Sequence, residues 1–205
     1  YQLIFHKFMT KFVSSFTEAD MNPTIDLLDN ETSAISKLTP SDYNDNLIQA
    51  LDLGIQGDFA PIQKLRSFKY KTSVIDGVEF EDENYKYQSK NLLIRHFYPK
   101  GCSPSTLPLF IYLHGGGWCF SYTEQRNYFG SKISKKCQVE FDLIEYSLSP
   151  EASCGTALDE VYSMYCELIK WSSTTRPIFL CGDSAGGNLS ACLIHKLKNS
   201  IGIEK

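Results

Sequence analysis

The sequence lacks several features that are typical of membrane proteins, nucleic-acid-binding proteins, zinc-binding proteins and small disulfide-rich proteins. It has no apolar run of about 18 residues, so no transmembrane segment is predicted. Its 20 Lys and Arg residues are scattered and its formal net charge is −4, so nucleic acid is not an expected partner. Its 7 cysteines include no C-x-x-C pair, which argues against a zinc site and against a small disulfide scaffold. The cysteine usage predicts a reducing, cytoplasmic setting.

The residues that are present divide the chain into two regions. Residues 1–65 have turn signals but no alternating β-branched runs, so we expect a helical, cap-like region that begins with an amphipathic helix over residues 1–16. In residues 66–205, short β-type runs alternate with helical patterns, which predicts an α/β domain. The strands are expected at residues 68–75, 92–98, 107–113, 139–146 and 178–181, with an amphipathic helix over residues 156–171.

The sharpest motif follows the last of these strands and opens a helix that reaches about residue 198. It reads Gly182-Asp183-Ser184-Ala185-Gly186, with a further glycine at 187. A serine between two glycines on a strand-to-helix turn is typical of a nucleophile elbow, because the glycines keep side chains from colliding as the chain reverses. Such a pentapeptide also arises by chance. The strand before it and the helix after it favour the catalytic interpretation, with Ser184 as nucleophile.

A second glycine motif, His114-Gly115-Gly116-Gly117-Trp118, ends the strand expected at residues 107–113. Consecutive glycines let backbone N–H groups approach a ligand closely, as an oxyanion hole requires. We expect Gly115 and Gly116 to donate, together with the N–H of Ala185. A phosphate-binding loop is a weaker alternative, since neither a Lys-Ser or Lys-Thr pair nor a G-x-G-x-x-G pattern accompanies it.

The two motifs, together with residues 145–152 and 157–160 between them, resemble the hormone-sensitive lipase family of esterases and lipases. The resemblance covers about residues 107–198. It implies an α/β-hydrolase fold, a three-layer architecture with a mostly parallel sheet and a helical cap built partly from the N-terminal region, and hydrolysis of carboxylic esters without cofactor or metal. It assigns the same roles to Ser184, Gly115, Gly116 and Ala185, and makes His114 a loop-shaping residue rather than the catalytic base.

One departure from the family pattern concerns a helix start. The family usually has Phe-Pro before Ala-Leu, whereas this chain has Ser153-Cys154-Gly155-Thr156. The departure bears on how the helix over residues 156–171 begins, and leaves the expected chemistry unchanged.

The expected partners of Ser184 in a catalytic triad are missing from the sequence. In this fold the acid and then the base follow the nucleophile along the chain, yet the only later histidine is His195 and the only later acidic residue is Glu204. His195 would lie about 16 Å along the helix from Ser184, out of hydrogen-bond reach. We therefore expect the acid and base beyond residue 205, in a longer protein. His6, His96 and His195 are interpreted as surface or packing residues.

Two alternatives to an enzyme stay open from the sequence. The gibberellin receptors are similar to this family and use its pocket without turnover, so a non-catalytic small-ligand receptor is one of them. An inactive truncated homologue is the other. The expected partner in the enzymatic case is a small-molecule or lipid ester, while acyl-chain length, contact with a lipid surface and oligomeric state do not follow from the residues.

Overall fold

The computed structural model describes residues 49–50, 52–54, 56–66, 73–121, 126–171 and 176–201. The chain divides into two compact units, residues 1–68 and residues 69–205. In the first unit the described residues include the helix α5 (Ala60–Arg66). The amphipathic helix expected over residues 1–16, and most of the helical region expected over residues 1–65, lie outside the described residues.

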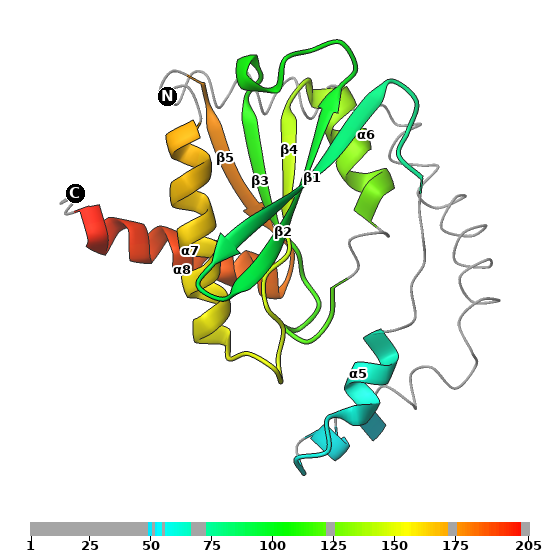
Figure 1. Cartoon of the computed structure of the whole chain (residues 1–205), viewed down its shortest axis with the longest axis vertical. Helices are drawn as coiled ribbons and strands as arrows, with labels where there is room; N and C mark the ends of the chain where they lie inside the picture. The colour runs from blue at the N-terminus through cyan, green and yellow to red at the C-terminus, as the bar shows by residue number, and fades with distance from the viewer. Residues whose placement is uncertain are drawn as a thin grey trace. The chain divides into compact units, whose positions relative to one another are not determined.

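The second unit contains a mixed sheet of five strands with the order β1-β2-β4-β3-β5 (Figure 1). Strand β3 runs parallel to β4 and β5, whereas β1 and β2 are antiparallel to each other and β2 is antiparallel to β4. In chain order the elements are β1 (Val78–Tyr87), β2 (Lys90–Pro99), the short 3₁₀ helix η1 (Pro104–Thr106), β3 (Leu109–Leu113), α6 (Asn127–Cys137), β4 (Glu140–Ile144), α7 (Cys154–Trp171), β5 (Ile178–Gly182) and α8 (Ala185–Ile201).

The first strand differs from the prediction. Residues 73–75 are not part of a strand, and β1 instead begins at Val78 and includes the acidic residues between Glu79 and Glu83, which lie between the first two strands expected from the sequence. Because β1 lies at the edge of the sheet and pairs only with β2, most of its side chains remain exposed and acidic residues are tolerated there. The charged residues of β1 therefore lack the hydrophobic pattern from which a strand could have been predicted.

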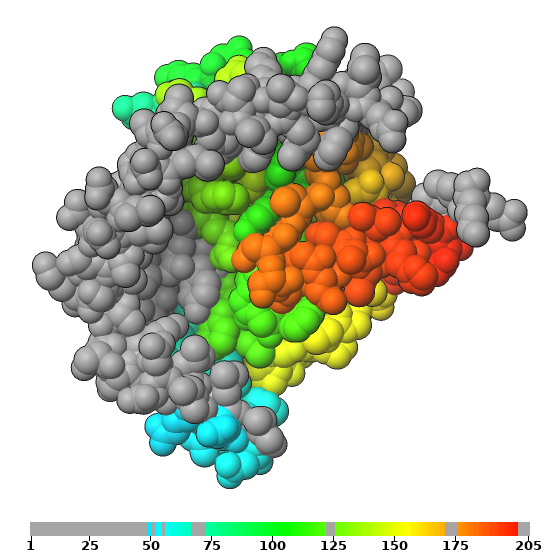
Figure 2. Space-filling model, turned by 180° about the vertical axis from the view of Figure 1, so that it is seen from behind, coloured from blue at the N-terminus to red at the C-terminus, as the bar shows by residue number. Residues whose placement is uncertain are grey.

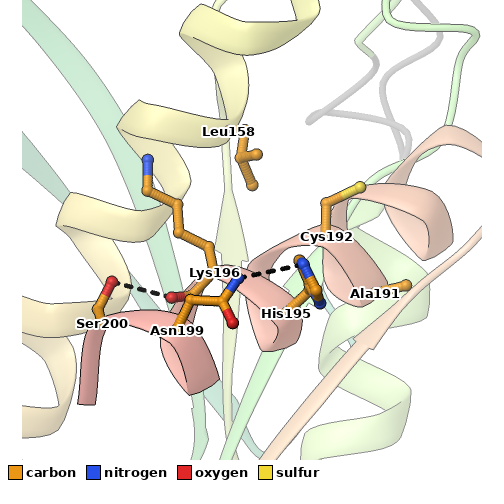
Figure 3. A pocket seen from close by; sticks show the side chains of 7 residues that line it. All are labelled: Leu158, Ala191, Cys192, His195, Lys196, Asn199 and Ser200. Atoms are coloured by element: carbon orange, nitrogen blue, oxygen red, sulfur yellow. Dashed lines mark hydrogen bonds between the residues drawn. The ribbon is translucent and has the colours of Figure 1, made fainter. Parts of the chain in front are cut away.

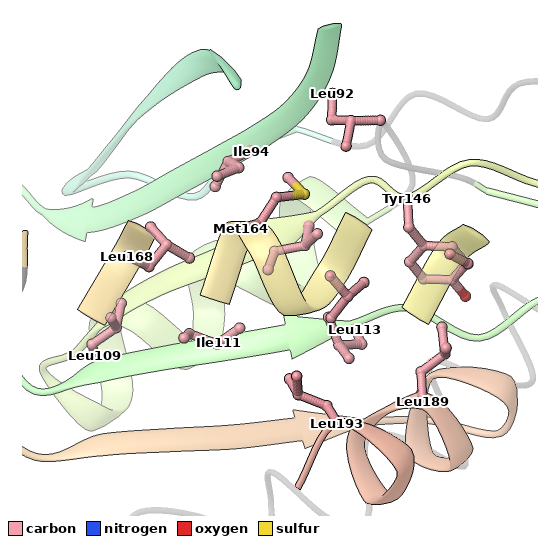
Figure 4. Packing of buried hydrophobic residues seen from close by; sticks show 13 residues of the cluster. Leu92, Ile94, Leu109, Ile111, Leu113, Tyr146, Met164, Leu168, Leu189 and Leu193 are labelled. Carbon is pink, nitrogen blue, oxygen red and sulfur yellow. The ribbon is translucent and has the colours of Figure 1, made fainter. Parts of the chain in front are cut away.

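Aliphatic side chains form the main core on the face of the sheet covered by α7 and α8 (Figure 4). Leu109, Ile111 and Leu113 alternate along β3 and are fully buried on this face. They pack in one cluster with Met164 and other residues of α7, and with Leu193 and other residues of α8. The strand expected at residues 107–113 is thus confirmed as β3, Leu109–Leu113, which lies between β4 and β5 and is covered on both faces.

The opposite face of the sheet is aromatic and carries α6. Phe141 on β4 stacks on Phe110 with ring centroids 5.4 Å apart, and it contacts Phe97 edge-on at 6.2 Å. Gly130 lets α6 approach this layer, since a Cβ there would lie 2.8 Å from the ring of Phe97. Helices on both faces give the three-layer α/β arrangement expected from the sequence.

Helix α7 begins with a side-chain cap. The Ser153 hydroxyl accepts a hydrogen bond from the N–H of Thr156 at 3.2 Å, three residues into the helix. A capping serine therefore starts this helix where the family pattern has Phe-Pro. None of the helices in the described part of the chain is both long and apolar enough to cross a membrane.

Candidate active site

The two glycine motifs meet at one edge of the sheet. Strands β3 and β5 are parallel neighbours, and Leu113 at the end of β3 pairs with Gly182 at the end of β5. The loop from His114 to Gly117 and the turn containing Ser184 therefore leave the sheet side by side, at the carboxyl ends of adjacent strands. The structure brings together the two segments that the sequence singled out.

Ser184 occupies a strained turn between β5 and α8. Its φ is +49°, in the left-handed region that side chains other than glycine rarely adopt, and its side chain is exposed. Figure 2 shows α8 and the end of β5 at the molecular surface. A Cβ on Gly186 would overlap the carbonyl oxygen of Leu113, and a Cβ on Gly182 would overlap the backbone of Gly186. The elbow geometry expected from the motif is present, while the nucleophilic role of Ser184 stays a prediction.

The loop after β3 is bent by residues with positive φ. Gly116 has a φ of +126° and Gly117 a φ of +60°, followed by Trp118 at +58°. The carbonyl oxygen of Gly116 accepts hydrogen bonds from the N–H groups of Cys119 and Phe120, at 3.0 and 2.9 Å. A Cβ on Gly116 would overlap the carbonyl oxygen of Phe120. This position therefore requires glycine for both its conformation and its space.

Asp183 ties the elbow to the glycine loop. Its Oδ1 accepts a hydrogen bond from the Gly115 N–H at 2.7 Å and another from the Tyr112 hydroxyl at 2.5 Å, and Arg126 Nη2 lies 4.0 Å away. Partial burial alone would raise the pKa of Asp183, but the hydrogen bonds from Tyr112 and Gly115 outweigh it and hold this pKa below its ordinary value. An ionised carboxylate next to the serine thus positions the loop.

This contact bears on the expected oxyanion hole. The Gly115 N–H is already bound to Asp183, so its use as a donor to an oxyanion would require that hydrogen bond to be exchanged. The N–H groups of Gly116, Gly117 and Ala185 have no hydrogen-bond partner in the described parts of the chain. Sequence reasoning missed this role of Asp183, because nothing local links two residues that are 68 positions apart.

His114 is a buried residue that contacts the glycine loop. It is fully buried, its ring stacks on Tyr146 at a centroid distance of 4.2 Å, and the Tyr146 hydroxyl donates to the His114 carbonyl oxygen at 2.5 Å. Its Nδ1 donates to the Gly115 carbonyl oxygen at 2.8 Å, which places the ring proton on Nδ1 because a carbonyl only accepts. Burial lowers the pKa of His114, so the ring is neutral. The ring thus contacts the glycine loop, and the loop-shaping role expected for His114 stays a prediction.

None of the described histidines hydrogen-bonds Ser184. His114 faces the glycine loop and His96 contacts Asp142 at 2.8 Å. His195 is exposed on α8, where its Nε2 lies 3.1 Å from the Asn199 amide (Figure 3). The open pocket drawn in Figure 3 lies between α7 and α8 and is lined by Leu158, Ala191, Cys192, His195, Lys196, Asn199 and Ser200. The expectation that His195 is a surface residue is confirmed, and the described residues supply no base.

One other group of side chains has the composition of a metal centre. His96 on β2 and Glu140 and Asp142 on β4 are buried, and one ligand atom from each lies within 4.8 Å of the others. Burial raises the pKa of Asp142 to about 6, against the opposing effect of the adjacent His96. His96 was interpreted as a surface or packing residue, although Glu140 and Asp142 inside the buried run 139–146 were a usable signal that a partner is required.

Comparison with known proteins places the fold in a family. The pattern of the family described as "alpha/beta hydrolase fold" matches residues 110–204. The chain is 31% identical over 128 residues to a putative α/β hydrolase of Acanthamoeba polyphaga mimivirus, covering 60% of this chain and 35% of the viral protein. It is 35% identical over 91 residues to mouse hormone-sensitive lipase, covering 42% of this chain and 12% of the lipase.

Solved structures agree with this assignment. A fungal esterase from Rhizomucor miehei is 29% identical, with a TM-score of 0.53, and the match covers 67% of this chain and 43% of the esterase. An esterase of the bacterial hormone-sensitive lipase family has a TM-score of 0.55 at 23% identity, which supports the fold alone. The chain spans about a third of the viral relative's length and less than half of either esterase. Residues 110–204 match the family described as "alpha/beta hydrolase fold", the chain has this fold, and the proteins to which it is similar include hormone-sensitive lipases.

Proposed function

We propose that this chain carries the nucleophile and the oxyanion hole of a carboxylic-ester hydrolase, with Ser184 attacking the ester carbonyl. The observation that carries the proposal is the strained turn at Ser184, whose φ of +49° lifts an exposed hydroxyl beside a glycine loop. Backbone strain of this kind costs about 1–3 kcal/mol and persists where surrounding structure supports it. Membership of a family with esterase and lipase homologues supports the same chemistry.

In the proposed reaction the Ser184 Oγ forms a bond to the carbonyl carbon while a general base takes its proton. The tetrahedral intermediate collapses, its bond to the alcohol oxygen breaks, and the alcohol leaves with that proton. Water then attacks the acyl-enzyme and releases the carboxylic acid and the free serine. The described residues supply the nucleophile and the backbone donors, and the proposal requires an acid and a base that they do not contain.

The negative oxygen of the intermediate needs preorganised donors. We propose that Gly116, Gly117 and Ala185 supply them, because their N–H groups have no other partner in the described residues. Ala185 also stands at the start of α8, where the helix dipole favours negative charge. Gly117 takes the place expected for Gly115, whose N–H holds the carboxylate of Asp183 instead.

The substrate is proposed only as a class, a small-molecule or lipid carboxylic ester. The relatives named above include both lipases and esterases, which is why no acyl length is assigned. We also propose a cytoplasmic setting, since none of the seven cysteines forms a disulfide within the described part of the chain.

The natural protein, expressed from its complete coding sequence, tests the reaction with p-nitrophenyl butyrate as substrate. Replacing Ser184 by Ala is expected to lower kcat by about 10⁴-fold or more, as for other serine hydrolases. Ser200→Ala is the matched control, because Ser200 lies exposed on the same helix and donates only to the Lys196 carbonyl. Equal turnover by Ser184→Ala and the unmodified protein would contradict the proposal, and saturable binding without turnover would favour a receptor.

A further inference from the structure

A buried cluster of charged groups lies away from Ser184, on the face of the sheet that α7 covers. His96 on β2 pairs in register with Asp142 on β4, and Glu140 lies two residues earlier on β4, on the same face. Glu140 pairs with Leu109 at the start of β3, whereas the glycine loop and Ser184 follow the ends of β3 and β5. The cluster therefore lies toward the opposite end of the parallel strands from the candidate active site.

Two carboxylates converge on a single nitrogen in this cluster. The Nδ1 of His96 lies 2.8 Å from Asp142 Oδ1 and 3.6 Å from Glu140 Oε1. This nitrogen can donate at most one proton, so it cannot hydrogen-bond fully to both. The other oxygen of Asp142, Oδ2, has no hydrogen-bond partner in the described residues, although the Asp142 side chain is only 1% exposed. An acceptor buried without a donor is costly, which indicates that a group is missing from its surroundings.

The charges around the cluster also favour a cation. Glu83 Oε2 lies 3.3 Å from His96 Nε2, and Arg176 pairs with Glu140 Oε2. Burial alone would lower the pKa of His96, but its hydrogen bonds to Asp142 and Glu140 outweigh this effect and raise the pKa to about 11, so the imidazole holds a proton when no metal is bound. The three carboxylates then exceed the imidazolium and the guanidinium by one negative charge, and by two once a metal ion displaces the proton. A divalent cation would balance this surplus without any rearrangement of the strands.

We propose that His96 Nδ1, Asp142 and Glu140 Oε1 bind one divalent transition-metal ion, with Zn²⁺ as the representative. At metal–ligand bonds of about 2.1 Å, separations of 2.8 and 3.6 Å correspond to angles of about 84° and about 118° at the ion. One ion can have both angles in a five-coordinate, trigonal-bipyramidal arrangement, whose ideal angles are about 90° and about 120°. His96 and Glu140 keep 6% and 8% exposure, which leaves room for water to complete the coordination.

The outer contacts match those of known metal sites. A histidine ligand usually directs its second nitrogen at a carboxylate, and a carboxylate ligand is usually held by a donor. Glu83 lies near the first position, 3.3 Å from His96 Nε2 but without the geometry of a hydrogen bond, and Arg176 takes the second. One imidazole with two carboxylates favours zinc and similar transition metals over Ca²⁺, which prefers oxygen ligands alone. The ion would join β2 to β4 and thereby stabilise the sheet, separately from the ester chemistry proposed above.

Metal binding to the natural protein, first stripped with a chelator, tests the proposal. Calorimetric titration with Zn²⁺ should show one ion bound per chain and a raised Tm, while Ca²⁺ should give neither. His96→Gln and Asp142→Asn should abolish binding, and Glu83→Gln should weaken it about 10- to 100-fold. His195→Gln is the matched control, since this exposed histidine lies on α8 and should leave the affinity unchanged.

Cobalt distinguishes this site from adventitious binding by the seven cysteines. Co²⁺ bound by nitrogen and oxygen should show visible d–d bands without the intense near-ultraviolet band of a thiolate ligand. A thiolate band, affinity unchanged in His96→Gln, or no stoichiometric binding to the unmodified protein would each overturn the proposal. The last result would mean that the cluster holds only a proton, shared between His96 and Asp142. Because the unmodified protein decides this point, a variant that fails to fold leaves the test intact.

Discussion

At the scale of single residues, the site depends on glycines that leave room for neighbouring backbone. Gly186 lies against the end of β3, where a Cβ would overlap the Leu113 carbonyl oxygen. A Cβ on Gly155 in α7 would instead have Ser153 Oγ as its nearest neighbour, at an ordinary contact distance of 3.6 Å. Both glycines are helical, so an intrinsic preference for alanine over glycine acts on both. The two positions differ in that a Cβ on Gly186 would overlap the sheet, whereas a Cβ on Gly155 would not.

Replacing Gly186 by Ala should therefore destabilise the protein by more than about 2 kcal/mol, because α8 must move away from the sheet to admit a methyl group. Gly155→Ala should be neutral or should stabilise by up to about 1 kcal/mol. Urea unfolding of both variants measures the difference. Equal stabilities would show that α8 can shift at little cost and that the elbow is not tightly packed.

At the scale of elements, the elbow and the glycine loop act as one unit through Asp183. Its carboxylate receives the Gly115 N–H and the Tyr112 hydroxyl while its side chain remains 53% exposed. Burial and the hydrogen bond to Asp183 raise the pKa of Tyr112 to about 12, so the hydroxyl keeps its proton and remains a donor. The orientation of the loop thus depends on a residue next to the serine rather than on the glycines alone.

Asp183→Ala should lower kcat/KM of the proposed reaction by about 10- to 100-fold through misplacement of the loop donors, with little change in Tm. Asp159→Ala is the matched control, because Asp159 is a similarly exposed aspartate that pairs with Lys196 on the surface. Ester turnover and thermal unfolding are measured together. A loss of Tm without a loss of kcat/KM would assign Asp183 a purely structural role.

The elements that carry the site were those that the sequence predicted best. Strand β3, strand β5 and helix α8 combine apolar periodicity with motifs at their ends, so both glycine segments and their adjacency were predictable. Strand β1 was misplaced because its exposed acidic residues carry no apolar pattern. The contacts of Asp183 and of His96 join distant residues, 68 and 46 positions apart, and no local signal encodes them.

At the scale of the whole molecule, stability is coupled to pH through a buried neutral histidine. Burial lowers the pKa of His114 below 6.5 in the folded protein, so the unfolded chain binds more protons near this pH. The contribution of His114 to stability is therefore complete above about pH 6.5 and decreases as the pH falls below it. The loop that offers donors to an oxyanion contacts this ring, so the His114 contribution to stability and the placement of these donors should both weaken in acid.

As the pH is lowered from about 7 to about 5, the free energy of unfolding of the unmodified protein should decrease relative to that of His114→Asn, because only the unmodified protein loses the His114 contribution. The raised pKa values of His96 and Asp142 act in the opposite direction, but they act in both proteins and cancel in the difference. Asparagine keeps a donor for the Gly115 carbonyl but does not titrate. Urea denaturation at a series of pH values gives both slopes. Identical slopes would mean that His114 titrates alike in the folded and unfolded chains.

Ester hydrolysis by this protein, as proposed above, requires that Ser184 is a reactive nucleophile and not merely a residue of the turn between β5 and α8. Treating the natural protein with a fluorophosphonate and mapping the adduct by peptide mass spectrometry tests this most directly. We expect one adduct per chain, on Ser184, and no adduct in Ser184→Ala. No adduct on the folded unmodified protein, or an adduct on another residue that persists in Ser184→Ala, would contradict this expectation.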